Sequence, residues 1–118
     1  MSSTTVTNVS VKHIRPVYKN LAEWCADPKN LYIGRAGVVF VEGKRYPSAP
    51  SPFANPFKIG RDGTRKDVLE KFEALMRQRL EVSPHLLSEL NGKTLGCWCS
   101  PEACHGDILK KLVLEFPF

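Results

Sequence analysis

Short segments typical of β-strands alternate along this chain with segments whose apolar residues recur at helical spacing. The predicted strands are residues 4–11, 31–35 and 93–99, and the predicted helices are residues 19–26 and three more that open at Thr64, at Ser83 and at Gly106-Asp107. This alternation favours parallel pairing, because each helix carries the chain back across the sheet. We therefore expect an α/β protein: a compact, single-domain, Rossmann-like layered fold, in two or three layers, with a short, mainly parallel sheet.

Three local patterns refine this expectation. Residues 38–41 and 44–46 flank Glu42-Gly43, which predicts a hairpin excursion from the sheet. Residues 47–56 hold four prolines, which predicts a loop. Thr64 is a good N-cap for the helix that follows it, and Asp67 three residues later gives a weak capping box.

The length of 118 residues predicts a single domain over residues 1–118. No apolar run approaches the roughly 18 residues that a membrane helix needs. The first residues show neither the basic nor the apolar region of a secretory signal. We therefore expect an intracellular, cytoplasmic protein with no membrane partner. Thiols stay reduced in that compartment, which favours metal binding, a reactive thiol or simple packing over disulfides.

Residues 96–107 read Gly-Cys-Trp-Cys-Ser-Pro-Glu-Ala-Cys-His-Gly-Asp and hold three of the four cysteines. They form a corner between the last predicted strand and the last predicted helix, a place where α/β proteins often carry function. A thiolate on Cys99 or Cys104 would be stabilised there by the helix N-terminus and by the His105 imidazole. Alternatively, the four ligands Cys97, Cys99, Cys104 and His105 would bind zinc, although their spacing is unusual for a zinc site, or Cys97 is simply buried.

Asp107, at the end of this motif, has two interpretations. As the N-cap of the last helix it would accept backbone N–H groups, which is the safer assignment because aspartate is a preferred cap. As a site residue it would act as a general base or hold a ribose hydroxyl. We include it among the candidate catalytic residues, which are Cys99, Cys104, His105 and Asp107.

The charge of the chain is +5, from 17 basic and 12 acidic side chains, which suits a nucleotide, another phosphorylated small molecule or a nucleic acid, although a solvated basic surface would look the same. Residues 55–65 combine glycines and basic residues just before a helix, an arrangement typical of anion sites but also of simple turns. An arginine at a strand end can also hold a phosphate. The candidate ligand-binding residues are Arg35, Asn55, Lys58, Arg61 and Thr64.

The motifs Tyr-Ile-Gly-Arg, Ala-Asn-Pro-Phe-Lys-Ile-Gly and Cys-Trp-Cys-x-Pro-x-x-Cys-His-Gly-Asp together resemble those of one family, domain of unknown function 4326, which occurs in bacteria, phages and large DNA viruses. The resemblance covers residues 5–114 and implies no activity; for a viral member, the compartment would be the host cytoplasm. Phe53-Ala54 stands where many members have Trp-Gly. The resemblance marks as motif positions Arg35, Asn55, Pro56, Phe57, Cys97, Cys99, Cys104, His105, Gly106 and Asp107.

Our first functional hypothesis is an enzyme of nucleotide or nucleobase metabolism, a hydrolase or transferase. Arg35, Lys58 and Arg61 would hold a phosphate, and Cys99 or Cys104 would act with His105 as a nucleophile or an acid–base pair. The alternative is a non-catalytic protein that binds a nucleotide or nucleic acid, with structural or zinc-bound cysteines. We expect no cofactor, with zinc as the one possibility, and the sequence leaves the oligomeric state open.

Overall fold

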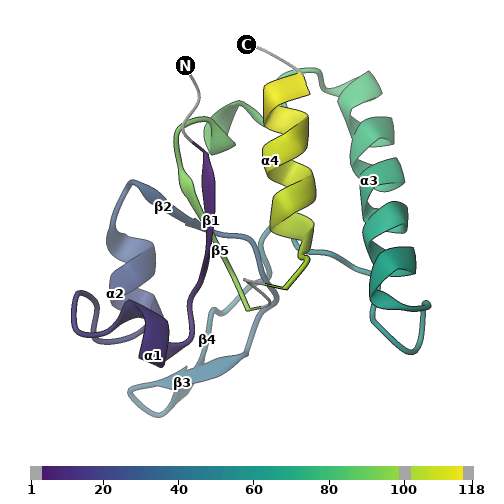
Figure 1. The fold of residues 1–118 in the computed structure, drawn as a ribbon. Helices are drawn as coiled ribbons and strands as arrows, with labels where there is room; N and C mark the ends of the chain where they lie inside the picture. Colours follow the sequence, from purple (N-terminus) through teal and green to yellow (C-terminus); the bar gives the residue numbers. More distant parts are fainter. Residues whose placement is uncertain (1–3, 99–101, 116–118) are drawn as a thin grey trace.

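The computed structural model describes residues 4–98 and 102–115, and its centre is a short parallel sheet (Figure 1). Strand β5 (Thr94–Cys97) lies in the middle, between β1 (Thr5–Asn8) and β2 (Asn30–Tyr32). Both outer strands pair with β5 in parallel, with Val6 opposite Leu95 and Leu31 opposite Leu95. The predicted α/β class and parallel sheet are therefore confirmed.

Side chains of the sheet alternate between two apolar cores, one on each face. On β5, Leu95 and Cys97 belong to the larger core, whereas Gly96 faces the other side. A Cβ on Gly96 would come within 2.5 Å of the Trp24 ring, so a glycine is needed here for the helix that carries Trp24 to approach the sheet. Each face of the sheet is thus covered, which suits a parallel arrangement.

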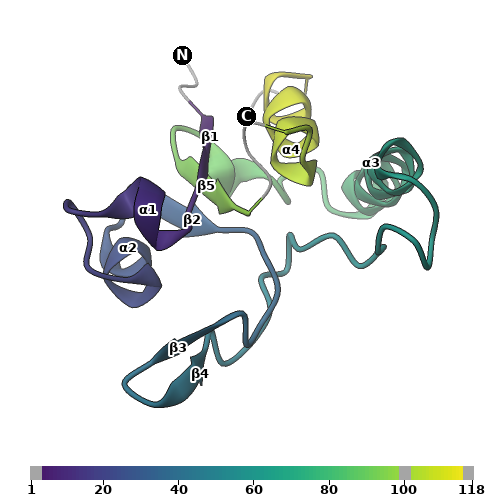
Figure 2. The same ribbon diagram turned by 60° about the horizontal axis from the view of Figure 1, so that its bottom comes forward.

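Helices cover both faces (Figure 2). The smaller core lies under α1 (Val11–Ile14) and α2 (Leu21–Ala26), through buried side chains such as Leu21 and Trp24. The larger core lies under α4 (His105–Glu115), which contacts β1 and β5, and α3 (Arg65–Val82) packs beside α4. The fold therefore has three layers. No helix in the described ranges is long and apolar enough to cross a membrane.

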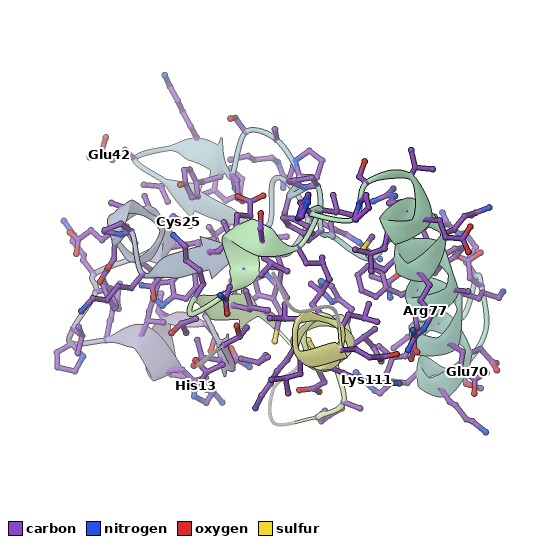
Figure 3. All side chains as sticks on the ribbon, turned by 90° about the horizontal axis from the view of Figure 1, so that it is seen from above. His13, Cys25, Glu42, Glu70, Arg77 and Lys111 are labelled. Atoms are coloured by element: carbon purple, nitrogen blue, oxygen red, sulfur yellow. The ribbon has the colours of Figure 1, made fainter. Side chains whose placement is uncertain are left out.

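Ion pairs join the outer sides of α3 and α4 (Figure 3). Arg77 forms a two-point contact with Glu115, at 2.9 Å for each nitrogen–oxygen pair, and Lys111 lies 3.1 Å from Glu73. These groups are partly exposed, so water screens them and each pair adds little to stability. The buried apolar side chains hold the two helices together.

A separate two-stranded hairpin leaves the sheet after β2 (Figure 2). Strands β3 (Val39–Val41) and β4 (Lys44–Tyr46) pair antiparallel around Glu42 and Gly43. Both turn residues have positive φ, 50° and 78°, as a tight hairpin turn requires. The predicted hairpin and its turn are confirmed.

Some predicted boundaries were wrong. The strand predicted over residues 4–11 ends at Asn8, because the Asn8 side chain accepts the Ser10 N–H at 2.8 Å and turns the chain into the short helix α1. The predicted strand 31–35 is replaced by residues 30–32. The helix predicted to open at Ser83 is a turn followed by the 3-10 helix η1 (Ser88–Leu90).

One of the two long helices begins where it was predicted to begin, and the other begins earlier. Helix α3 begins after Thr64 with the predicted capping box to Asp67. Helix α4 begins at His105, ahead of the predicted Gly106-Asp107. Strand β5 ends at Cys97, and Cys99 lies outside the described residues.

Candidate functional site

A pocket of about 480 Å³ lies beyond the carboxyl ends of β2 and β5, between the first turns of α3 and α4. Ligands of open parallel sheets bind at this edge. Four parts of the chain meet there: the residues that follow β2, the 55–59 loop, the start of α3, and the corner between β5 and α4. The side chains and backbone that line the pocket belong to Gly34, Arg35, Val38, Asn55, Phe57, Lys58, Ile59, Arg65, Val68, Leu69, Cys97, Trp98, Ala103, Cys104 and His105.

Basic side chains and large aromatic rings are prominent in the lining of this pocket. Arg35, Lys58 and Arg65 line it, and the described residues contribute no carboxylate to its lining. Phe57 and Trp98 add planar apolar surface. The electrostatic potential inside is therefore positive, which favours an anionic ligand.

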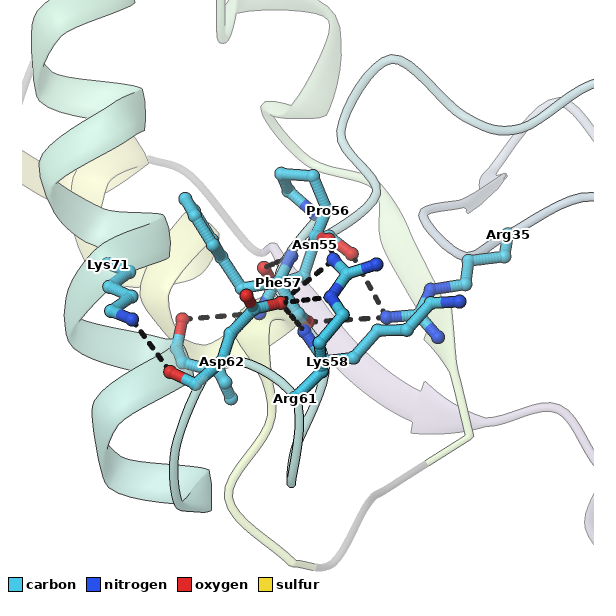
Figure 4. A network of polar contacts seen from close by, with 9 residues as sticks. Arg35, Asn55, Pro56, Phe57, Lys58, Arg61, Asp62 and Lys71 are labelled. Atoms are coloured by element: carbon cyan, nitrogen blue, oxygen red, sulfur yellow. Dashed lines mark hydrogen bonds and ion pairs between the residues drawn. The ribbon is translucent and has the colours of Figure 1, made fainter.

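Arg35 lines the pocket and contacts the 55–59 loop (Figure 4). Its guanidinium donates to the carbonyl oxygens of Asn55 at 3.4 Å and Phe57 at 3.2 Å. Two contacts from one end of the guanidinium fix its position and leave the rest of this planar group exposed. The predicted ligand-binding position of Arg35 thus borders the pocket.

Asn55 mainly shapes the loop. Its side-chain oxygen accepts the Phe57 N–H at 2.9 Å, and its amide donates to the Val68 carbonyl of α3 at 3.3 Å. An asparagine that bonds to the backbone two residues later forms a turn, which explains the Asn-Pro-Phe sequence in local terms. Asn55 lines the pocket, but both ends of its amide already have partners.

Of the three remaining predicted ligand-binding residues, one lines the pocket and two do not. Lys58 lines the pocket, and its ammonium contacts no acidic side chain among the described residues. Arg61 contacts Asp62 at 2.8 Å and the Pro56 carbonyl at 3.1 Å (Figure 4), and it does not line the pocket. Thr64 caps α3. The structure therefore does not bring Arg61 and Thr64 to the site.

Arg65 is a site residue that the sequence analysis did not select. As the first residue of α3, it donates to the Ala103 carbonyl at 2.9 Å and pairs with Glu102 at 3.0 Å. These contacts join the start of α3 to the β5–α4 corner across the pocket. The signal was its position just after a cap, since the first turn of a helix presents its side chains at the anion-binding end.

Cys104 occupies the residue before α4 and borders the pocket, although only 2% of its surface is exposed. Its sulfur accepts the Gly106 N–H at 3.2 Å, and its own N–H donates to the Asp107 carboxylate at 3.1 Å. Asp107 is therefore the third residue of the helix, not its N-cap as predicted. Its carboxylate serves the helix start and does not line the pocket.

His105 follows directly and places its ring between the sheet and α3. Its Nε2 is 2.7 Å from the Ile33 carbonyl oxygen, which can only accept, so Nε2 carries a proton. The other nitrogen, Nδ1, is 3.9 Å from the Cys104 sulfur. The edge of the Phe72 ring packs against the imidazole, with centroids 5.1 Å apart.

Burial is the main cause that holds the pKa of His105 below its usual value, and the nearby Arg35 charge acts in the same direction. The Ile33 hydrogen bond and Asp107 oppose this shift. The imidazole is therefore neutral at pH 7, with Nδ1 as a proton acceptor beside a thiol.

A tyrosine hydroxyl links the two strand ends under the pocket. Tyr32 donates to the Arg35 carbonyl at 2.9 Å and accepts the Trp98 indole N–H at 2.9 Å. A Cβ on Gly34 would collide with the Tyr32 ring, so the glycine of the Tyr-Ile-Gly-Arg motif is required here. This link fixes Arg35 and Trp98 relative to each other.

The zinc alternative concerns Cys97, Cys99, Cys104 and His105. Within residues 4–98 and 102–115, no group of three or more His, Cys, Asp or Glu side chains is arranged to hold a metal ion. Cys99 falls outside those ranges. Cys97 is buried beneath the pocket and borders it.

Comparison with known proteins identifies relatives but no solved structure. The family model for a domain of unknown function, DUF4326, matches residues 17–115. The uncharacterized 12.4 kDa protein in the nrdA-td intergenic region of Enterobacteria phage T4 is 37% identical over 59 residues, which cover 47% of this chain and 55% of that protein. The match thus spans about half the length of this relative. No solved structure matches the chain significantly.

Proposed function

The chain belongs to the family described as domain of unknown function 4326, and from its pocket we propose a nucleotide- or nucleobase-related enzyme, a hydrolase or transferase. Its ligand is a phosphorylated molecule of nucleotide size. The observation that carries this proposal is one pocket lined both by three cationic side chains and by a thiol–imidazole pair. Arg65 is paired with Glu102, whereas Arg35 and Lys58 pair with no carboxylate in the described ranges.

Phosphate recognition rests on Arg35, Lys58 and Arg65, together with the positive ends of α3 and α4. The volume of about 480 Å³ falls within the roughly 300–1,000 Å³ typical of small-molecule sites. Phe57 and Trp98 offer planar surface for a base. The location beyond the strand ends supports a Rossmann-like layout as part of the same proposal.

The chemistry would use Cys104 and His105. Nδ1 of the neutral imidazole takes the thiol proton, and the Gly106 N–H stabilises the resulting thiolate. The thiolate sulfur bonds to an electrophilic atom of the ligand, and the leaving group departs with the electrons of the broken bond and takes the proton from His105. Water, or an acceptor hydroxyl, then displaces the sulfur and returns its proton to it. This chemistry needs a reduced thiol, consistent with an intracellular setting.

A non-catalytic binding protein is the second candidate, and one observation favours it. Cys104 is 2% exposed and already accepts the Gly106 N–H, as a structural helix cap would. In that case the pocket binds its ligand and Cys104 only shapes the pocket wall.

Timed alkylation separates the two candidates. Although Cys104 is the more buried of the two thiols, we expect iodoacetamide to modify it faster than Cys25, because His105 and the Gly106 N–H would stabilise its thiolate, whereas burial raises the pKa of the Cys25 thiol. A mononucleotide such as AMP should protect Cys104 and not Cys25. Lys58→Ala should raise the nucleotide concentration for half-protection about tenfold, since it removes one charge-assisted contact. Peptide mass spectrometry measures each rate.

The matched control is Lys66→Ala, which removes an equal charge from the exposed side of α3 and should leave protection unchanged. Protection of the fold by nucleotides without fast alkylation of Cys104 would support the binding protein. Faster labelling at Cys25, with no nucleotide effect at Cys104, would contradict the enzyme proposal.

A further inference from the structure

We propose that the pocket receives one nucleotide of a single-stranded nucleic acid, and that the outward face of the β3–β4 hairpin holds the nucleotides next to it. This inference rests on the proposed function, because it takes the pocket as the nucleotide site. It adds a class of ligand, a single-stranded polynucleotide, and a second contact surface, the hairpin.

The outward face of the hairpin follows from its pairing. Val39 pairs with Tyr46, and both pack against the smaller core. Phe40 and Arg45 pair one position along and therefore face away from that core. Val38, two residues before Phe40, shares its face and lines the pocket. The pocket wall thus continues onto the hairpin.

Exposed apolar side chains gather along this wall. Phe40 is 66% exposed and Val38 is 42% exposed, and Ile59, which also lines the pocket, is 55% exposed. The Arg45 guanidinium lies 4.9 Å from the centre of the Phe40 ring and donates to the Gly37 carbonyl at 3.0 Å. An aromatic ring in water beside a fixed cation is a surface on which a base can stack.

Charge along the wall selects the partner. Arg35 and Lys58 in the pocket and Arg45 on the outward face of the hairpin supply positive charge along this wall, and Glu42 lies at the hairpin turn. Proteins that bind single strands combine a basic track with stacking aromatics. An acidic peptide would use the charge without the ring, and a second copy of this basic chain would be repelled by it.

The test compares one ligand length with another. We expect a fluorescein-labelled dT10 strand to bind at least tenfold more tightly than TMP, by fluorescence anisotropy and calorimetry respectively. Phe40→Ala should weaken dT10 binding about tenfold, the loss expected for one stacked base, and leave TMP binding within twofold. Because Phe40 is exposed, this variant keeps its fold. Val17→Ala, which truncates an apolar side chain near α1 that is also exposed, is the control and should change neither affinity.

Several results would overturn the inference. If dT10 binds no more tightly than TMP, or if Phe40→Ala weakens both ligands equally, the hairpin does not extend the site. Equal binding of deca-glutamate would show general attraction to polyanions, and self-association lost in Phe40→Ala would assign the face to a second copy. Failure of TMP to bind any variant would instead contradict the proposed function itself.

Discussion

The first turns of α3 and α4 have similar four-residue arrangements but differ in the capping atom and in the N–H group that this atom accepts. At α3, the Thr64 hydroxyl accepts the Asp67 N–H at 3.2 Å, and the Asp67 carboxylate accepts the Thr64 N–H at 2.9 Å. At α4, Asp107 accepts the Cys104 N–H at 3.1 Å, but the capping atom is the Cys104 sulfur, which accepts the Gly106 N–H. A hydroxyl caps one helix and a thiol caps the other.

Both helix starts border the pocket, through Arg65 and through Cys104 and His105, but only the start of α4 supplies a thiol and an imidazole. Sulfur is a weak acceptor, so a thiol caps a helix less well than threonine does. The first helical residues also differ, because Arg65 is always charged, whereas burial keeps His105 neutral. The weaker cap and the uncharged first residue both border the pocket, which is where a reactive pair is useful.

The second residue of each helix gives the largest expected difference. A Cβ on Gly106 would approach Ile33 and Val6 to 3.0 Å, whereas Lys66 at the same position of α3 is exposed. We expect Gly106→Leu to lower the free energy of unfolding by about 1–3 kcal/mol through overpacking. Lys66→Leu should change it by less than about 0.5 kcal/mol. Urea denaturation measures both, and equal effects would contradict the comparison.

The first residue of each helix gives a pH effect. The unfolded chain protonates His105 near pH 6.5, whereas the folded chain keeps it neutral because its pKa is lowered. The free energy of unfolding should therefore fall as the pH drops below about 6.5, by at most about 1.4 kcal/mol per pH unit. Unfolding at pH 7.5, 6.5 and 5.5 should show a smaller slope for His105→Gln.

Two comparisons check this pH effect. His13→Gln alters an exposed histidine of α1 and should keep the slope of the unchanged protein. Arg65 carries its charge throughout this pH range, so the start of α3 adds no such slope. The same slope in His105→Gln and in the unchanged protein would show that the His105 environment does not favour the neutral ring.

The capping atom itself gives the smallest effect. Thr64→Cys copies the α4 arrangement onto α3 and should lower the free energy of unfolding by about 0.5–1 kcal/mol, since the sulfur caps poorly. Thr64→Ser keeps the hydroxyl and should stay within about 0.5 kcal/mol of the original. Thermal and urea unfolding measure the difference. If Thr64→Cys left the free energy of unfolding unchanged, the sulfur of Cys104 would not weaken the start of α4.

Periodicity and turn chemistry were sufficient to predict the α/β class, the hairpin and the cap at Thr64. They could not predict which basic side chain enters the pocket. Arg61 and Arg65 are four residues apart in one basic stretch, but Asp62 binds Arg61, and the start of α3 directs Arg65 to the corner. These outcomes depend on contacts across the fold, which no local pattern contains.

The same limit applied to Asp107 and to α1. A shift of the helix start by three residues moves Asp107 from the cap to the third helical position, where its carboxylate serves Cys104. The β-branched run 4–11 has strand propensity throughout, but one side-chain bond from Asn8 to the Ser10 N–H ends the strand early. Element type was predictable, and element boundaries depended on single hydrogen bonds.

The central position of β5 sets the order in which this protein can assemble during synthesis. Both outer strands precede β5 by more than sixty residues and pair only with it. No part of the parallel sheet can form until residues 94–97 have left the ribosome, and the pocket also needs the corner that follows. A nascent chain that stops before β5 therefore exposes two unpaired strands, which makes stalled or truncated products targets for chaperones and proteases rather than partly active proteins.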